Sequence, residues 1–170
     1  MAQKEFVDPA TLFKDSFTLA RKVYDSGFRP DVLLVLWRGG APIGMVVHEF
    51  LAYKGIESRQ IVIKAESYTS VEKKTEPRIE KMDDAFSALD EDARVLVIDD
   101  IYDTGETAKE VRKLLALRTG NVRIATLYLK KGHESGPVYW VREVTGWVVF
   151  PHEIVGLSPD EIARKDAYIR

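Results

Sequence analysis

A short acidic segment contains the residues of this sequence that are best suited to chemistry. An apolar run, Val95–Ile98, leads into adjacent carboxylates at Asp99 and Asp100, and a third carboxylate follows at Asp103. A turn that enters a helix presents free backbone N–H groups and the positive end of the helix dipole, so it can bind a phosphate. Carboxylates beside such a turn would repel the phosphate itself, and they therefore suit sugar hydroxyls or a magnesium ion.

The turn after these carboxylates has the composition of a phosphate site. Gly105 allows the backbone to come close to a phosphate, and Thr104 and Thr107 provide hydroxyl donors. A structural alternative is a helix cap, in which Asp103 and Glu106 form a capping box. The cap explains these two acids but leaves the paired carboxylates, the glycine and the threonines without a role, so we favour the phosphate site.

A second loop has the composition of an anion site. Arg38, Gly39 and Gly40 follow the apolar run Val32–Leu36. A guanidinium binds an anion strongly, and glycines let backbone amides approach it. A Gly-Gly turn before a helix that opens with proline is common. This loop therefore indicates an anion site only when it is considered together with the acidic segment.

The apolar periodicity predicts the elements that position both loops. Expected helices cover residues 9–26, 42–54 and 104–118, and expected strands cover residues 32–36, 59–65, 94–98, 122–129, 138–141 and 147–150. The polar segment 67–78 is expected to be a loop, and residues 82–89 a short helix. This alternation predicts an α/β fold, with a parallel sheet flanked by helices on both faces, in one domain over residues 1–170. Ligands of such sheets bind beyond the carboxyl ends of the strands, where both loops lie.

Composition narrows the classes of protein that fit. The chain has 170 residues, of which 45% are hydrophobic and 31% are charged, as expected for a globular domain. A net charge of -2 disfavours general nucleic-acid binding, and the absence of cysteine excludes disulfides and thiolate chemistry. The sequence contains no apolar run long enough to span a bilayer, and its first residues lack the apolar core of a signal peptide. We therefore expect a cytoplasmic protein without a membrane partner.

The acidic segment closely resembles the phosphoribosyl pyrophosphate motif of the type I phosphoribosyltransferases. It has four apolar residues, two acids, two apolar residues and then Asp-Thr-Gly-x-Thr. The resemblance implies that Asp99 and Asp100 bind the ribose hydroxyls, directly or through Mg²⁺, with Asp100 as the metal ligand. It also implies that the 5′-phosphate is bound by Asp103, Thr104, Gly105, Glu106 and Thr107. In the purine members, the acid matching Asp103 is the proposed general base.

The same resemblance assigns roles outside this segment. Arg38, Gly39 and Gly40 would hold the pyrophosphate, and Ser67 with Tyr68 would open a mobile lid, although a solvated loop is the simpler interpretation of that pair. Lys130 would donate to the 6-oxo group of a purine, with Lys131 as the competing choice.

The last informative segment is similar to the base-binding segment of bacterial xanthine-guanine enzymes. By that similarity, Trp147 would stack on the base, and main-chain carbonyls around Val148 would contact its edge. His152 departs from the family pattern, and we interpret it as structural rather than catalytic. Glu153 and Arg164 are open candidates for the metal or pyrophosphate site. The resemblance extends from about Pro30 to Glu153.

The resemblance implies a purine phosphoribosyltransferase. Its ligands would be phosphoribosyl pyrophosphate, Mg²⁺ and a 6-oxopurine, its sheet would carry a small hood built from the chain-terminal segments, and it would form a homo-oligomer. Two alternatives stay open. One is the same chemistry on a pyrimidine base. The other is a regulator that binds the sugar diphosphate and a nucleic acid or protein, for which Lys73, Lys74 and Arg78 give only a short basic cluster.

Overall fold

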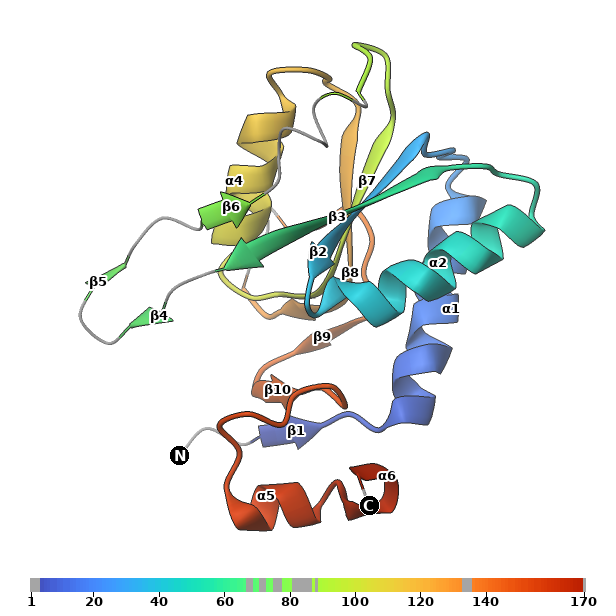
Figure 1. The fold of residues 1–170 in the computed structure, drawn as a ribbon. Coiled ribbons are helices and arrows are strands. Elements are labelled where there is room, and N and C mark those ends of the chain that lie inside the picture. Colours follow the sequence, from blue (N-terminus) through green and yellow to red (C-terminus); the bar gives the residue numbers. More distant parts are fainter. Residues whose placement is uncertain are drawn as a thin grey trace.

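A central six-stranded sheet organises the molecule, in the order β6-β3-β2-β7-β8-β9 (Figure 1). The computed structural model describes residues 4–66, 69–70, 73–74, 78–80, 87, 89–132 and 136–169. The strands of this sheet are β2 (Val32–Trp37), β3 (Arg59–Glu66), β6 (Arg78–Glu80), β7 (Val95–Tyr102), β8 (Val122–Lys130) and β9 (Arg142–Val144). All neighbouring pairs are parallel except β3 and β6, which pair antiparallel at one edge.

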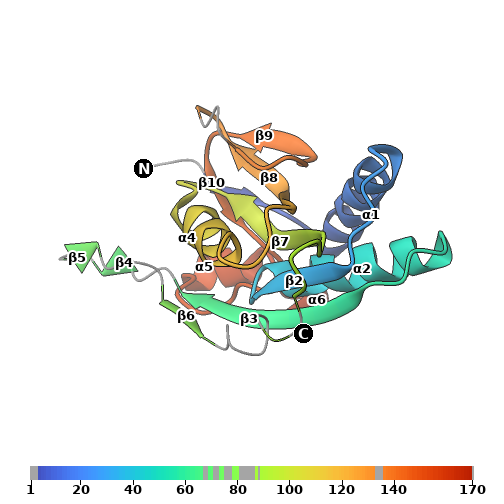
Figure 2. The ribbon, with the colours of Figure 1, turned by 90° about the horizontal axis from the view of Figure 1, so that it is seen from above.

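Helices cover both faces of the sheet, as predicted. Helices α1 (Pro9–Asp25) and α2 (Gly40–Tyr53) lie on one face, and α4 (Glu106–Leu115) lies on the other (Figure 2). The side chains of β2 alternate between two cores: Leu33 and Val35 pack under α1 and α2, whereas Leu34 packs under α4. The continuous apolar run of this strand therefore reflects burial on both faces.

The helix starts show how local sequence sets the elements. The Asp8 side chain accepts a hydrogen bond from the Thr11 backbone N–H at 2.9 Å, and Pro9 occupies the first turn of α1. Helix α2 begins at Gly40, earlier than the predicted start at Pro42, because the glycine turn is already part of the helix entry. Among the described residues, no helix is both long and apolar enough to cross a membrane.

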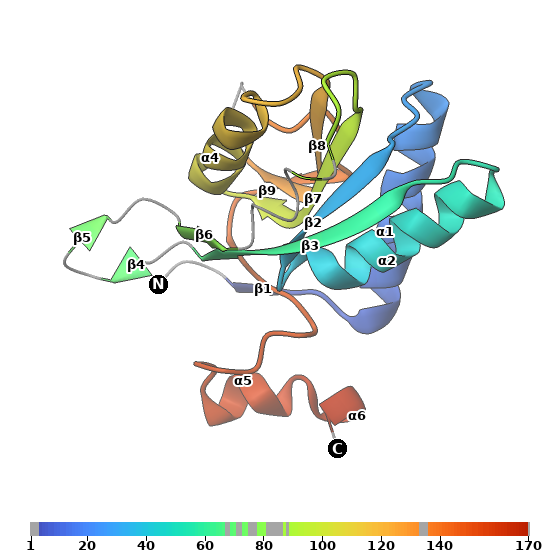
Figure 3. The ribbon, with the colours of Figure 1, turned by 45° about the horizontal axis from the view of Figure 1, so that its top comes forward.

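A small hood closes the carboxyl end of the sheet and is built from both chain ends (Figure 3). It consists of β1 (Lys4–Phe6), β10 (Trp147–Val149), α5 (Pro159–Ala163) and α6 (Asp166–Ile169). Strands β1 and β10 pair in parallel, and Val7 N donates to Val149 O at 3.0 Å. The Lys4 ammonium pairs with the Glu161 carboxylate of α5, so the two chain ends are joined directly.

Several predicted elements differ from the observed ones. Residues 138–141 form only an isolated bridge between Tyr139 and Ala125. The edge strand of the sheet is instead the neighbouring β9, which pairs with β8. The helix predicted over 104–118 is shorter at both ends. Within the predicted loop, β4 (Thr69–Ser70) and β5 (Lys73–Lys74) pair antiparallel. Most of the helix predicted over 82–89 lies outside the described residues.

Candidate active site

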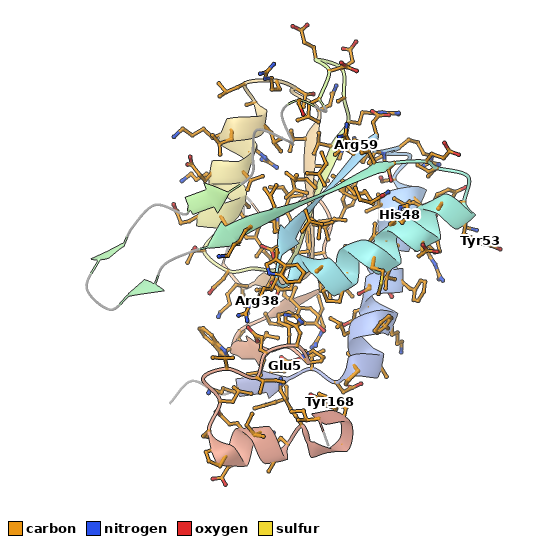
Figure 4. All side chains as sticks on the ribbon, viewed as in Figure 1. Glu5, Arg38, His48, Tyr53, Arg59 and Tyr168 are labelled. Atoms are coloured by element: carbon orange, nitrogen blue, oxygen red, sulfur yellow. The ribbon has the colours of Figure 1, made fainter. Side chains whose placement is uncertain are left out.

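A cavity of about 810 Å³ lies at the carboxyl ends of β2, β7 and β8, where the hood meets the sheet. Arg38 lies at this end of the sheet, on the side that faces the hood residue Glu5 (Figure 4). Most of the residues singled out from the sequence line the cavity: Arg38, Gly39, Asp99, Asp100, Asp103, Thr104, Gly105, Glu106, Thr107, Lys130, Trp147 and Val148. Gly40 lies just behind this lining, and Ser67 and Tyr68 are outside the described residues.

The paired carboxylates lie within strand β7 rather than after it, because β7 continues to Tyr102. Asp99 Oδ1 accepts a hydrogen bond from the Asp100 N–H at 3.0 Å. Asp100 Oδ1 accepts one from the Ile101 N–H at 2.8 Å. These bonds to consecutive backbone amides fix both carboxylates at the wall of the cavity.

The electrostatics of this pair favour a cationic or hydroxyl-rich ligand. Burial, and then the adjacent Asp100 charge, raise the pKa of Asp99 well above its ordinary value. Two neighbouring carboxylates supply the oxygen ligands that Mg²⁺ prefers. No group of three or more metal-binding side chains occurs in the described part of the chain. The donor set therefore fits Mg²⁺ held by one or two carboxylates together with substrate oxygens.

The turn after β7 requires glycine and leaves the helix start open. Gly105 has φ +78°, and a Cβ there would lie 2.4 Å from the Tyr102 hydroxyl oxygen. Gly105 is also the N-cap of α4, and because it has no side chain it cannot cap the helix by a side-chain hydrogen bond. The Glu106 N–H donates only weakly, to Thr104 Oγ1 at 3.4 Å. The capping-box alternative for Asp103 is therefore wrong, because the helix begins too late for Asp103 to cap it. The open N-terminus of α4 suits an anion.

Asp103 faces a cation from the neighbouring strand. Lys130, at the end of β8, places its Nζ 3.5 Å from Asp103 Oδ1. Lys131 is exposed and does not line the cavity, while its backbone N–H bonds to Val144 O at 2.9 Å. Of the two lysines left open by the sequence, the structure brings Lys130 to the cavity.

The glycines after β2 allow a close approach between the two loops. A Cβ at Gly39 would lie 2.0 Å from Asp100 Oδ2, and one at Gly40 would lie 2.3 Å from Ile98 O. A side chain at Gly39 would displace the Asp100 carboxylate, and one at Gly40 would displace the backbone of β7. The Trp37–Arg38 peptide bond is cis, and the exposed Arg38 lines the same cavity as the carboxylates.

Two stacked rings, Phe150 and His152, line the cavity on the hood side. Their centroids are 5.6 Å apart, and Phe150 also stacks on the buried ring of Tyr128 at 5.5 Å. His152 Nε2 then lies 3.7 Å from Asp100 Oδ2. Trp147 is 56% exposed at the cavity rim. The interpretation of His152 as structural is incomplete, since its ring lines the cavity.

Other lining residues were not found from the sequence. Lys64 lines the cavity because it lies in register with Trp37 across β2 and β3, a pairing that a single sequence does not reveal. Of the two residues left open from the sequence, Glu153 lines the cavity, with Oε2 accepting from Phe150 N at 2.9 Å. Arg164 does not line it, because its guanidinium lies over the Phe6 ring at 4.2 Å.

Solved structures with the same fold come from several organisms. A purine phosphoribosyltransferase from Pyrococcus horikoshii is 26% identical, with a TM-score of 0.72 over 91% of this chain and 97% of that one. A hypothetical protein from Neisseria gonorrhoeae with bound ppGpp is 20% identical, with a TM-score of 0.76 over 98% of both chains. The xanthine-guanine-hypoxanthine phosphoribosyltransferase of Helicobacter pylori is 20% identical, with a TM-score of 0.66 over 88% of this chain and 92% of that one.

The match to a family model covers nearly the whole chain. The phosphoribosyl transferase domain model matches residues 2–160. It therefore includes the N-terminal strand and helix, where no resemblance was apparent from the motifs. Taken with the acidic segment at the end of β7 and the glycine turn after β2, this match shows that the chain belongs to the phosphoribosyltransferase family.

Proposed function

We propose that this phosphoribosyltransferase is Mg²⁺-dependent and converts a 6-oxopurine and phosphoribosyl pyrophosphate into the nucleoside monophosphate and pyrophosphate. One observation carries the choice of base. The Asp103 carboxylate and the Lys130 ammonium lie 3.5 Å apart next to the phosphate turn, so an acceptor and a donor face the same part of the cavity. A 6-oxopurine offers a ring N–H and an oxo group close together, which matches such a pair.

The sugar–phosphate side of the cavity would bind phosphoribosyl pyrophosphate through its two loops. The 5′-phosphate would lie at the open N-terminus of α4, where Thr104 and Thr107 add hydroxyl donors. Asp99 and Asp100 would hold the ribose hydroxyls and keep negative charge near the sugar as positive charge develops on it. Arg38 would bind the pyrophosphate, which leaves from the opposite side of the ribose.

Mg²⁺ would be held by Asp100 together with ligand oxygens and would offset the charge of the departing pyrophosphate. The raised pKa of Asp99 supports a cation at this position, because a positive charge next to the two carboxylates relieves their repulsion.

The base side would orient the purine for attack on the ribose C1′. Trp147 offers an exposed ring for stacking, and Lys130 would donate to the oxo group. Because Val7 N bonds to Val149 O, and alternate residues of a parallel strand face the same neighbour, the peptide groups of Val148 point away from β1. They would contact the base edge. As the new C–N bond forms and the C–O bond to pyrophosphate breaks, Asp103 would accept the ring proton.

A panel of bases tests this function against both alternatives. Pyrophosphate release should be followed with hypoxanthine, guanine, xanthine, adenine, orotate and uracil, each with Mg²⁺ and with excess chelator. We expect turnover with at least one 6-oxopurine and none in chelator. Turnover only with a pyrimidine would support the pyrimidine alternative. Binding of phosphoribosyl pyrophosphate without turnover of any base would support the regulatory one.

A further inference from the structure

A lysine lies fully buried in the hood, away from the cavity. Lys165, between α5 and α6, has 0% of its surface exposed, and it is the only charged residue among the buried ones in the described parts of the chain. Its Nζ donates to the main-chain carbonyls of Phe150 at 2.5 Å, Glu153 at 2.5 Å and Pro151 at 3.4 Å. An ammonium has three N–H donors, so this arrangement can use all of them.

Burial of this ammonium needs an explanation, because a charged group taken out of water is costly unless it is well bonded. Burial lowers the pKa of Lys165, and the nearby Glu153 charge acts in the opposite direction. The three carbonyls hold the ammonium, and no carboxylate among the described side chains forms an ion pair with it. All three carbonyls belong to one turn, residues 150–153, so the buried ammonium holds this turn in place.

This turn forms part of the cavity wall. Its first residue, Phe150, stacks with both Tyr128 and His152, and its third, His152, reaches to 3.7 Å from Asp100 Oδ2. The turn is also closed internally, since Glu153 Oε2 accepts from Phe150 N at 2.9 Å and Glu153 N donates to Phe150 O at 3.1 Å. The carbonyls of Phe150, Pro151 and Glu153 bond to Lys165, while His152 and Glu153 line the cavity.

We propose that Lys165 is a positioning residue that fixes the 150–153 turn as the base-side wall, so that Lys165 influences base affinity without itself touching the ligand. The identity of the ligand as a purine nucleotide rests on the proposed function. Apart from the 3.7 Å approach of His152 Nε2 to Asp100 Oδ2, the contacts described for the sugar–phosphate loops lie within β7 and at the start of α4 and do not involve the turn or Lys165. Loss of Lys165 should therefore weaken binding of the base and spare binding of phosphoribosyl pyrophosphate.

The test uses Lys165→Met, which keeps the length and removes the charge, and Lys165→Gln, which keeps two N–H donors. Lys113→Met is the matched control, because its side chain is 76% exposed on α4 and outside the cavity. Calorimetry should compare binding of inosine monophosphate with binding of phosphoribosyl pyrophosphate. The measurements should be made with Mg²⁺ and well below the melting temperature of each variant. Steady-state assays should give KM for the base and kcat.

We expect Lys165→Met to weaken nucleotide binding and raise KM for the base by about tenfold or more, as for the loss of one to two hydrogen bonds to a charged group. Affinity for phosphoribosyl pyrophosphate should stay within about twofold, and Lys165→Gln should be intermediate. Equal losses for both ligands would reduce Lys165 to a general structural role and overturn the proposal. Wild-type affinities in the variants would also overturn it. If the Met variant does not fold, the Gln variant is judged by the same criteria.

Amide hydrogen exchange gives a readout that needs no ligand. Exchange over residues 147–153 should accelerate in both Lys165 variants and stay unchanged over residues 99–107. Uniform acceleration, or none, contradicts the proposal. If the wild-type protein binds a pyrimidine nucleotide or no nucleotide, the proposed function fails, and the exchange pattern still decides the role of Lys165.

Discussion

In the proposed assignment, the sugar–phosphate side of the cavity is built from two short loops, each continuous in sequence, whereas the base side is assembled from segments at both ends of the chain. The carboxylates of β7 are fixed by bonds to the next residue along, and Gly105 by its own φ of +78°. On the base side, β10 pairs with β1, and the turn after it is held by Lys165 of the C-terminal segment. One side depends on local geometry, and the other on long-range packing.

The difference separates two tasks. Binding of a ribose phosphate needs open amides and carboxylates at fixed spacing, which a short segment can supply alone. Selection of a base needs a ring, a donor and main-chain groups from different elements, and these come together only through tertiary contacts. Substitutions on the sugar–phosphate side should therefore act on phosphoribosyl pyrophosphate, and those on the base side on the base.

Asp103 lies where the two sides meet and should show the largest effect. Asp103→Asn keeps the shape and removes the basicity, so turnover with hypoxanthine or guanine should fall by about 10²–10⁴-fold, the usual contribution of general acid–base catalysis. Affinity for phosphoribosyl pyrophosphate and the melting temperature should hold. Steady-state kinetics and thermal melts on one preparation check this. Near-normal turnover in a stable variant would show that Asp103 does not act as the general base.

Arg38 tests the sugar–phosphate side. Arg38→Ala should weaken the binding of phosphoribosyl pyrophosphate and of pyrophosphate by about 10–150-fold, the equivalent of 1.5–3 kcal/mol for a bidentate charged contact. Binding of the nucleotide product, which lacks pyrophosphate, should hold. Arg59→Ala is a suitable control, since Arg59 lies at the opposite end of the sheet (Figure 4). Calorimetry with each ligand measures the contrast, and an equal loss of nucleotide affinity would show that the loop is assigned wrongly.

Lys130 tests the base side, with Lys131 as its neighbouring control. Lys130→Ala should raise KM for hypoxanthine by about tenfold, because one charged donor to the oxo group is lost. KM for phosphoribosyl pyrophosphate should change little, and Lys131→Ala, at an exposed position, should resemble the wild type. Initial rates with both substrates varied give the two constants. A larger effect at Lys131 would exchange the roles of the two lysines.

Asp99 should show the smallest of these effects, a change in the stability of the fold that has a distinctive pH dependence. Because the pKa of Asp99 is raised in the folded state, its ionisation costs stability as pH rises from its ordinary value of about 3.9 through the raised value. Without Mg²⁺, Asp99→Asn should therefore melt higher than the wild type at neutral pH, by roughly 2–4 °C for each kcal/mol gained. It should also bind phosphoribosyl pyrophosphate less tightly.

Thermal melts at several pH values check the sign of this predicted stability difference between Asp99→Asn and the wild type. The advantage of the Asn variant should shrink as pH falls through the raised pKa of Asp99 and should vanish below its ordinary value. An Asn variant that is less stable than the wild type at neutral pH would mean that the ionised carboxylate stabilises the fold.

The sequence was sufficient for the central strands, the helices on both faces and the acidic segment, because their signals are local. Strand β7 extends past the predicted end because Ile101 and Tyr102 pair with β8, and paired carboxylates inside a strand break the apolar pattern. Strand β1 was missed because its three residues form a strand only by pairing with β10. Lys165 gave no signal, since one lysine in a polar segment does not reveal its burial.

The pairing of β1 with β10 also has a consequence for protein synthesis. Strand β1 leaves the ribosome before its partner β10, which is made more than a hundred residues later, and the turn after β10 is fixed only once Lys165 has been made. A nascent chain could build the sheet and the phosphate turn while the base wall is still missing. Activity toward a base should therefore appear only after Lys165 has been translated and has left the ribosome.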